Sequence, residues 1–266
     1  MLDFSAEAIR ALILDMDGVL WRDSEAIGDL AAIFERINDL KLQVVLATNN
    51  ATRRPSQYIE KLAVFGVKLT ESQIATSAQA VLVHLKDRYP VGCPVHVIGM
   101  DSLKEQICDA GFVQSESNVK AVIVGIDRHI TYEKIRLAST LIRAGAEFIG
   151  TNPDKTFPTP QGLVPGAGSI IAAVAAAAET EPLFVGKPGT LLMDVSLSKL
   201  KGVDKSQVLM VGDRLDTDIA AGIHFGCRTA LVLSGVTSIE TLSTSQVKPD
   251  YVFSDLSDLV GVQANG

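Results

Sequence analysis

The chain has 266 residues, enough for one large domain or two smaller ones with a substantial buried core. Its net charge is −7 and it contains no block of Lys and Arg, which argues against nucleic acid or an anionic membrane as the main partner. Three widely spaced cysteines form neither a disulfide framework nor a CxxC metal motif, and four isolated histidines disfavour a zinc site.

The N-terminal stretch lacks the features of a secretory signal, because Asp3 and Glu7 precede Arg10 and no long apolar segment follows. The most apolar tract, Ser169–Ala178, is about ten residues long, far short of the roughly 20 that span a bilayer. We therefore expect a soluble cytoplasmic protein.

Short apolar runs bounded by turn residues predict buried strands along the whole chain. These strands are expected at Ala11–Leu14, Leu42–Ala47, Gln73–Thr76, Val95–Gly99, Val119–Ile126, Ala146–Gly150, Leu183–Val185, Val208–Val211 and Thr229–Leu233.

Apolar residues at helical spacing predict a helix after most of these strands. The helices are expected at Ala26–Leu40, Pro55–Phe65, the segment after Thr76 up to Arg88, Ser102–Ala110, Tyr132–Ala144, Gly166–Glu179, Thr190–Lys201 and Asp218–His224. The proline and glycine content of Phe157–Gly162 predicts a loop, and the tail beyond Leu233 is polar and rich in turn residues apart from Tyr251–Phe253.

Alternation of continuous apolar strands with helices is typical of an α/β fold, in which helices cover both faces of a doubly wound parallel sheet. A break between Pro90 and Pro94 precedes a second strand–helix series. We therefore expect a core formed by residues 1–81 and 182–266, interrupted by an inserted α/β domain over residues 82–181.

The first strand ends in Asp15-Met16-Asp17-Gly18, so two carboxylates project to the same side of an extended chain. Ligands of open α/β sheets bind beyond the carboxyl ends of the strands. Paired carboxylates repel each other unless a cation compensates, and Mg²⁺ suits oxygen ligands. An ordinary turn closing the strand explains the same residues about as well when they are taken alone.

Three further predicted strands also end in chemically useful groups. Thr48-Asn49 directly follows one of them, and single glycines separate the other two from Lys187 and from the Asp213–Asp218 segment. Each also has a purely structural explanation: Thr48 and the Asp213 segment could cap helices, and Lys187 could be a surface lysine.

The four strand ends together suit phosphoryl transfer. Asp15 has the chemistry of a nucleophile, and Asp17 that of an acid and base. Asp213 adds a third carboxylate, which with Asp15 could hold Mg²⁺. The Thr48 hydroxyl and the Lys187 ammonium could bind and neutralise phosphoryl oxygens.

The motifs DMDGVLW, LATNN, VGKP and VGDRLDTDI occur in the order seen in the haloacid dehalogenase superfamily, and the chain resembles its NagD-like p-nitrophenylphosphatase group over essentially its whole length. The resemblance implies a Rossmann-like core with a large α/β cap inserted between the TNN and GKP motifs.

The resemblance also implies a role for each motif residue. Asp15 is expected to be the nucleophile and a Mg²⁺ ligand, and Asp17 the acid/base, with its backbone carbonyl on the metal. The expected phosphate-binding and remaining metal residues are Thr48, Asn49 and Lys187 for phosphate, Asp213 as a metal ligand, and Asp218 supporting the metal shell through water.

The expected activity is Mg²⁺-dependent hydrolysis of small phosphorylated metabolites through an aspartyl-phosphate. Asp17 favours a phosphatase over a dehalogenase, since the superfamily's phosphatases carry this second Asp. A phosphotransferase or mutase on the same scaffold, or a non-catalytic phosphoacceptor or binding protein, remains an alternative. Asn152-Pro153-Asp154 and the loop up to Pro165 are candidates for substrate selection, and a homodimer through the cap is plausible for the group.

Overall fold

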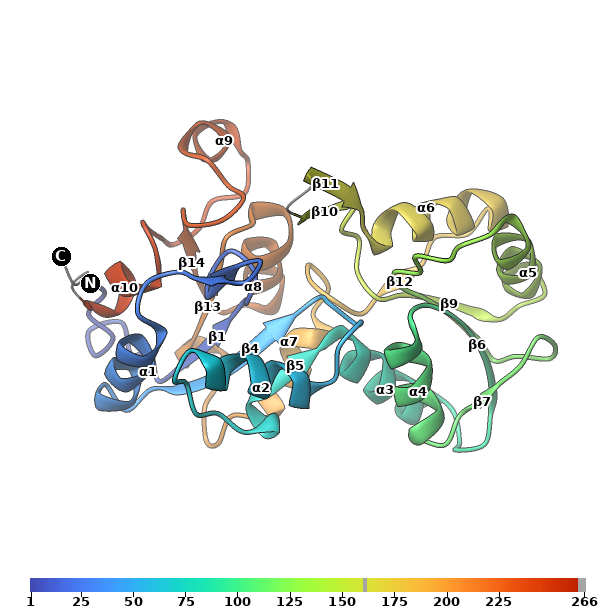
Figure 1. Ribbon diagram of the computed structural model, residues 1–266, viewed down its shortest axis with the longest axis horizontal. Helices are drawn as coiled ribbons and strands as arrows, with labels where there is room; N and C mark the ends of the chain where they lie inside the picture. The colour runs from blue at the N-terminus through green and yellow to red at the C-terminus, as the bar shows by residue number, and fades with distance from the viewer. Residues whose placement is uncertain (160–161, 263–266) are drawn as a thin grey trace. The chain divides into compact units, whose positions relative to one another are not determined.

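The computed structural model describes residues 1–159 and 162–262 of the chain. Its packing divides into two compact units, each with its own parallel sheet (Figure 1). The first unit comprises residues 1–48, 55–75 and 187–266, and the second comprises residues 49–54 and 76–186. The predicted α/β fold with parallel sheets is confirmed.

The sheet of the first unit has six strands in the order β15-β14-β13-β1-β4-β5. Their bounds are β1 Ala11–Leu14, β4 Gln43–Thr48, β5 Ile74–Thr76, β13 Val208–Gly212, β14 Arg228–Val232 and β15 Tyr251–Phe253. The pairs from β15 to β4 are all parallel, and β1 lies between β13 and β4.

Helices cover both faces of this sheet. On one face, Leu12 and Leu14 of β1 belong to an apolar cluster with α1 (Leu30–Asp39), α2 (Pro55–Val64) and α10 (Leu256–Val260). Leu231 alternates with Ala230 and Val232 along β14 and so faces the other side. There it packs against Leu215 and Ile219. Because both faces are apolar, the strands are continuous hydrophobic runs.

The remaining helical elements of the first unit lie in its C-terminal segment. They are α7 Leu191–Ser198, the 3₁₀ turn Lys205–Gln207, the π-helical turn Leu215–Ile219, α8 Ala220–Phe225 and α9 Ile239–Thr244. The helix α7 packs on β4 and α8 packs on β14. A further 3₁₀ turn, Glu71–Gln73, leads into β5.

The second unit contains a five-stranded parallel sheet in the order β12-β9-β8-β6-β7. Its strands are β6 Pro94–Ile98, β7 Val113–Gln114, β8 Ala121–Val124, β9 Glu147–Gly150 and β12 Leu183–Phe184. Its helices are α3 Ser77–Arg88, α4 Asp101–Asp109, α5 Tyr132–Arg143 and α6 Ala167–Ala178. The last two share one apolar cluster with β6, β8 and β9.

Several predicted elements differ from the structure. The expected helix Ala26–Leu40 starts only at Leu30, because Gly28 adopts a positive φ of 73° and Asp29 caps the helix through Ala32. The preceding residues form a hairpin of β2 (Trp21–Arg22) and β3 (Glu25–Ala26).

The C-terminal half also departs from the prediction. The expected loop Phe157–Gly162 is wrong, because β10 (Thr156–Thr159) pairs with β11 (Gly162–Pro165); residues 160 and 161 of that prediction lie outside the described ranges. The polar tail contains α9 and α10, whose N-caps are Ser238 and Asp255.

Candidate active site

Asp15 and Asp213 lie side by side because their strands are neighbours. Leu14 of β1 is in register with Val211 of β13, and the Asp15 N–H donates to the Val211 carbonyl. Asp213 directly follows Gly212 at the end of β13. The carboxyl edge of the sheet therefore brings together two acidic groups that are about 200 residues apart in sequence.

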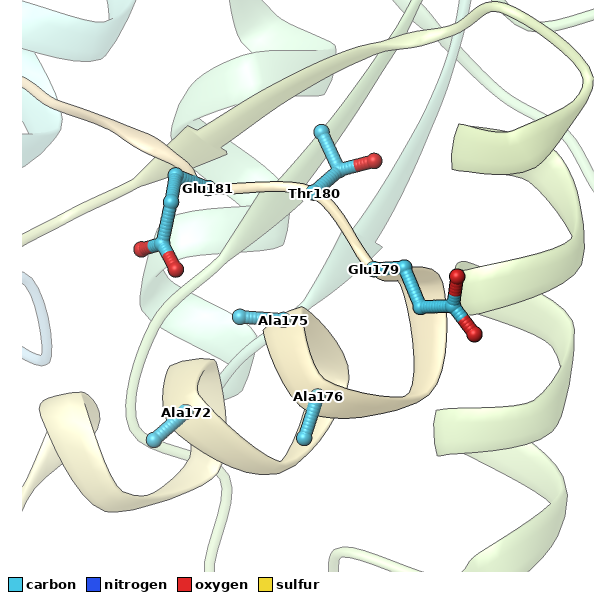
Figure 2. A pocket seen from close by; sticks show the side chains of 6 residues that line it. All are labelled: Ala172, Ala175, Ala176, Glu179, Thr180 and Glu181. Atoms are coloured by element: carbon cyan, nitrogen blue, oxygen red, sulfur yellow. The ribbon is translucent and has the colours of Figure 1, made fainter.

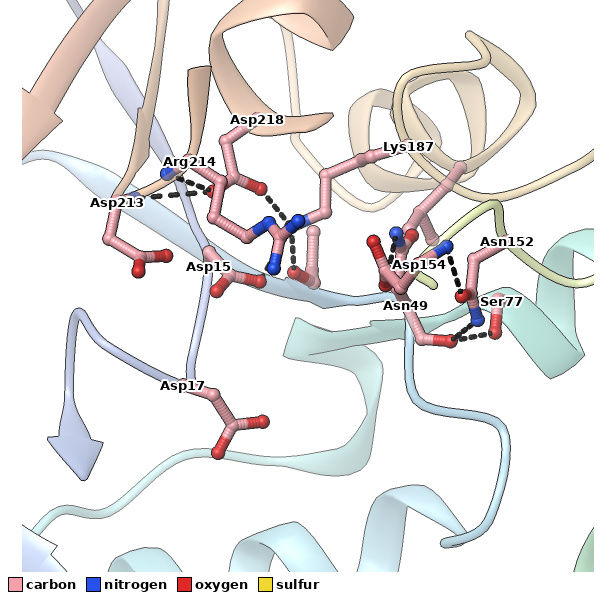
Figure 3. A network of polar contacts seen from close by, with 12 residues as sticks. Asp15, Asp17, Asn49, Ser77, Asn152, Asp154, Lys187, Asp213, Arg214 and Asp218 are labelled. Atoms are coloured by element: carbon pink, nitrogen blue, oxygen red, sulfur yellow. Dashed lines mark hydrogen bonds and ion pairs between the residues drawn. The ribbon is translucent and has the colours of Figure 1, made fainter. Parts of the chain in front are cut away.

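Lys187 forms the centre of this cluster (Figure 3). Its side chain is 1% exposed. The Nζ atom donates to Asp15 Oδ1 at 2.5 Å and to the Ala47 carbonyl at 3.0 Å, and it pairs with Asp218 Oδ1 at 2.7 Å. The lysine follows β12, which pairs with β9 in the second sheet and not with the strand that ends in Asp15. Lys187 therefore follows a strand of a different sheet from the one whose strands end at or directly before Asp15, Thr48 and Asp213.

Both carboxylate oxygens of Asp218 have contacts that hold the turn in place. Its Oδ1 atom faces the Lys187 ammonium, while Oδ2 accepts the backbone N–H groups of Asp213 and Arg214 at 3.2 and 3.1 Å. Its side chain is 2% exposed. Asp218 thus ties the turn after β13 to the lysine. Asp216, two residues earlier, points outward and pairs with Arg214.

Backbone groups hold Asp213 in place. Its Oδ2 atom accepts the Val236 N–H at 2.6 Å, and Gly18 and Gly235 lie directly against the carboxylate. Gly18 has a φ of +86°, and a Cβ there would lie 2.5 Å from Asp213 Oδ2. A glycine is required at position 18 for both reasons. Oδ1 of Asp213 is buried and has no hydrogen-bond partner among residues 1–159 and 162–262.

The cluster carries excess negative charge. Burial raises the pKa of Asp15 well above its ordinary range; the Lys187 ammonium opposes this, and the Asp218 and Asp213 charges add to it. Burial and the Asp218 charge raise the pKa of Asp213 to about 7. Burial opposes the charge of Lys187, but the Asp15 and Asp218 carboxylates raise its pKa above the usual range.

These residues fit a divalent cation. Carboxylate oxygens of Asp15, Asp213 and Asp218 lie within 4.8 Å of one another. The Lys187 ammonium pairs with two of the three carboxylates, and the unpartnered Oδ1 of Asp213 offers a ligand atom that is already desolvated. Oxygen-only donor sets of this kind suit hard cations.

Asp17 lies apart from this cluster, as Figure 3 shows. Its side chain is exposed, and its Oδ1 atom accepts the indole N–H of Trp21 at 2.8 Å. Trp21 belongs to the DMDGVLW motif, but no pattern in that motif predicted this contact.

Thr48 and Asn49 fall on either side of the division into units. Thr48 ends β4 in the first unit and is 3% exposed. Asn49 belongs to the second unit, where its Nδ2 donates to Asp154 Oδ2 at 3.2 Å and its carbonyl accepts from Ser77 Oγ and Asn152 Nδ2. The candidate selection residues Asn152 and Asp154 thus contact a predicted phosphate-binding residue.

Comparison with known proteins identifies the family. The profile of haloacid dehalogenase-like hydrolases matches residues 12–113, and a second profile, described as HAD-hydrolase-like, matches residues 184–259. The acid sugar phosphatase of Staphylococcus epidermidis is 36% identical over 249 residues, which cover 93% of this chain and 95% of that protein. The chain belongs to the haloacid dehalogenase-like hydrolases.

Solved structures of this family share the whole fold. The 4-nitrophenylphosphatase of Thermotoga maritima superposes with a TM-score of 0.90 at 36% identity, covering 97% of this chain and 98% of that one. NagD from E. coli K-12 gives a TM-score of 0.86 at 32% identity, covering 94% and 98%. The predicted superfamily, the NagD-like group and the assignment as a phosphoric monoester hydrolase are confirmed.

A hollow of about 390 Å³ in the second unit does not have the chemistry of a phosphate site (Figure 2). It is lined by Ala172, Ala175, Ala176, Glu179, Thr180 and Glu181. Two acidic side chains and no basic one would repel a phosphate anion.

None of the helices in the described ranges is long and apolar enough to cross a membrane.

Sequence reasoning missed the groups that support the acidic cluster. The Val236 N–H acts through the backbone, so its side chain carries no signal of the role. Ser234, whose Oγ donates to the Gly18 carbonyl at 2.7 Å, lies 216 residues away from its partner. Only the topology, which places β14 beside β13, brings these groups to the motif glycine.

Proposed function

We propose that this chain is a Mg²⁺-dependent phosphatase that hydrolyses small phosphomonoesters through an aspartyl-phosphate on Asp15. The observation that carries the proposal is the buried Lys187, whose Nζ atom lies 2.5 Å from Asp15 Oδ1 and 2.7 Å from Asp218 Oδ1. The ammonium fixes one oxygen of Asp15 and supplies positive charge where phosphoryl oxygens would gather.

In the first half-reaction, a carboxylate oxygen of Asp15 attacks phosphorus and the bond from phosphorus to the ester oxygen breaks. Asp17 gives its proton to the departing oxygen, which leaves as an alcohol. Thr48, Asn49 and Lys187 bind the phosphoryl oxygens. Burial of Thr48 and Lys187 supports this role, because fixed donors in a water-poor site stabilise developing charge strongly.

In the second half-reaction, Asp17 takes a proton from water, and the water oxygen attacks the phosphorus of the aspartyl-phosphate. The bond between phosphorus and Asp15 breaks, releasing inorganic phosphate and the free carboxylate. The same residue therefore serves as acid and then as base. Its exposed position supports contact with both the leaving group and water.

Asp15, Asp213 and the Asp17 carbonyl would hold Mg²⁺, and Asp218 would support it through water. When bound, the cation would neutralise charge on the phosphoryl group. The unpartnered Asp213 Oδ1 supports this assignment. Asp218 also pairs directly with Lys187, so its contribution to a metal shell would use the same carboxylate that holds the lysine.

Residues 82–181 are proposed to act as the cap that selects the substrate. The contacts of Asn152 and Asp154 with Asn49 support a link between this segment and phosphate binding. Sugar phosphates are the first substrate class to test, because a relative 36% identical to this chain is named an acid sugar phosphatase. A homodimer through the cap and a cytoplasmic location are part of the same proposal.

The test is phosphate release from p-nitrophenyl phosphate and a panel of sugar, nucleoside and other metabolite monoesters, with Mg²⁺ or EDTA. Asp15→Asn should lower turnover by orders of magnitude, because the nucleophile is lost. Asp216→Asn is the matched control, since Asp216 is exposed and its one ion pair within residues 1–159 and 162–262 is with Arg214. Absence of turnover by folded wild-type protein on every ester would overturn the proposal; phosphate transfer to sugars faster than to water would replace it with a phosphotransferase.

A further inference from the structure

The indole of Trp21 is the partner of the proposed acid/base. Its Nε1–H donates to Asp17 Oδ1 at 2.8 Å, and Asp17 makes no other side-chain hydrogen bond within residues 1–159 and 162–262. Oδ2 of Asp17 therefore stays without a protein partner in that range, on a side chain that is exposed. The two oxygens of one carboxylate have different surroundings.

The indole itself is held firmly. Trp21 is 1% exposed, and its ring stacks on Phe65 with centroids 6.3 Å apart. Lys61 Nζ lies 3.9 Å from the ring centroid and also donates to the Asp23 carbonyl at 2.7 Å. The Gly18 N–H donates to the Trp21 carbonyl at 2.8 Å, so a backbone hydrogen bond links the turn after β1 to the first strand of the hairpin. A buried ring with contacts on its face presents its N–H in one fixed direction.

We propose that Trp21 is a positioning residue that binds Oδ1 of Asp17 and thereby reserves Oδ2 for proton transfer to the leaving group and from water. The proposal rests on the proposed phosphatase function. An indole N–H donates and cannot accept, so the oxygen that it contacts acts as an acceptor in both protonation states of Asp17. The proton of the acid form is thus directed onto Oδ2.

The proton is transferred through Oδ2 in both half-reactions, because Oδ1 accepts the indole N–H. In the first half-reaction the Oδ2–H bond breaks, and the proton moves to the ester oxygen as its bond to phosphorus breaks. In the second, Oδ2 accepts a proton from the attacking water. The N–H of Trp21 stays on nitrogen throughout, so Trp21 exchanges no proton with the substrate.

Trp21 is the only tryptophan in the chain, which allows a change of a single group. Protein made in a tryptophan auxotroph with the benzothiophene analogue of tryptophan keeps the shape of the ring and replaces only the N–H by sulfur. We compare kcat/KM for an alkyl phosphate, whose leaving oxygen needs a proton, with that for p-nitrophenyl phosphate, whose leaving group departs readily without one.

General acid catalysis contributes about 10²- to 10⁴-fold. Partial loss of orientation should therefore lower kcat/KM for the alkyl ester by about tenfold or more, while the value for p-nitrophenyl phosphate should change less than about twofold. In an Asp17→Asn background the same analogue should have no further selective effect, because the acid is already missing.

Two control variants alter the packing of the ring and keep its N–H. Lys61→Met removes the ammonium over the ring, and Phe65→Leu removes the stacked ring. Both should lower the ratio of alkyl to aryl kcat/KM by less than the analogue does, because the N–H is still present to bind Asp17. If they lower the ratio as much as the analogue does, or if the analogue slows both esters equally or neither, Trp21 does not position Asp17. Absence of turnover by wild-type protein is a different result, which refutes the proposed function itself.

Discussion

Replacement of Lys187 by methionine tests the charge balance of the cluster most sharply. Methionine has a similar length and lacks the ammonium, so the change removes the cation from the buried Asp218 carboxylate and from the Asp15 carboxylate, which is 13% exposed. Removing one partner of a buried ion pair costs about 3–5 kcal/mol. A single domain of ordinary stability has about 5–15 kcal/mol, so Lys187→Met should fold and be measurably weakened.

The assay is urea unfolding in EDTA near neutral pH, compared with the same measurement in Mg²⁺. The cation should reduce the loss in the variant, because it neutralises the carboxylates that Lys187 no longer faces. Adding Asp218→Asn should restore part of the stability, since the new amide can accept from the Asp213 and Arg214 N–H groups and donate toward Asp15. Lys120→Met, at an exposed lysine, is the control and should change stability little.

A free energy of unfolding for Lys187→Met within about 1 kcal/mol of that of wild type in EDTA would contradict this prediction, since removing one partner of a buried ion pair should cost more. A loss of stability in the double variant equal to the sum of the losses in the two single variants would also contradict it. Either result would mean that the carboxylates compensate one another by protonation or water, and that the lysine does not hold Asp15.

Three further predictions concern the same edge of the sheet. The pKa of Asp213 in the folded protein is about 7, above its ordinary value of 3.8, so its contribution to stability is complete below the ordinary value and is lost as pH rises through 7. In EDTA, the free energy of unfolding of wild type should therefore fall by about 3 kcal/mol relative to that of Asp213→Asn between about pH 5 and about pH 8. Mg²⁺ should reverse that trend. Equal unfolding curves for both proteins across this pH range would contradict the prediction. Gly18→Ala should cost more than the about 1–3 kcal/mol of backbone strain and weaken Mg²⁺ binding measured by calorimetry, because its Cβ would also meet Asp213 Oδ2. Gly92→Ala, with φ +91° and open space around it, should cost only that strain. Thr48→Val should raise KM for p-nitrophenyl phosphate about tenfold while the unfolding midpoint stays near wild type, because it removes one hydroxyl and keeps the shape of a buried side chain; an unchanged KM would remove Thr48 from the phosphate site.

Local pattern was enough to predict the elements that depend on burial. The apolar run Ala11–Leu14 matches β1 with the same bounds, and continuous apolar strands followed by helices indicated the parallel sheets. A period of 3.6 residues placed α5 within one residue of its observed end. These features depend on which side chains face the core, so the pattern of neighbouring residues is enough to predict them.

Other features depend on residues that are far apart or on backbone geometry. The helix expected from Ala26 begins at Leu30 because Gly28 turns the chain, and the apolar pattern alone could not show that turn. The contact between Lys187 and Asp15 spans 172 residues. No local spacing predicts that β12 joins the second sheet while the lysine after it contacts the first strand.

The central claim is that Asp15 carries the phosphoryl group during turnover. The most direct measurement uses Asp17→Asn protein, which should still accept phosphate from p-nitrophenyl phosphate but lacks the base for the water step. After rapid acid quenching, peptide mass spectrometry should locate one phosphoryl group on Asp15, and borohydride should convert that residue to homoserine. A phosphoryl group on another residue, or a burst of p-nitrophenol without any phosphorylated Asp15, would contradict the account.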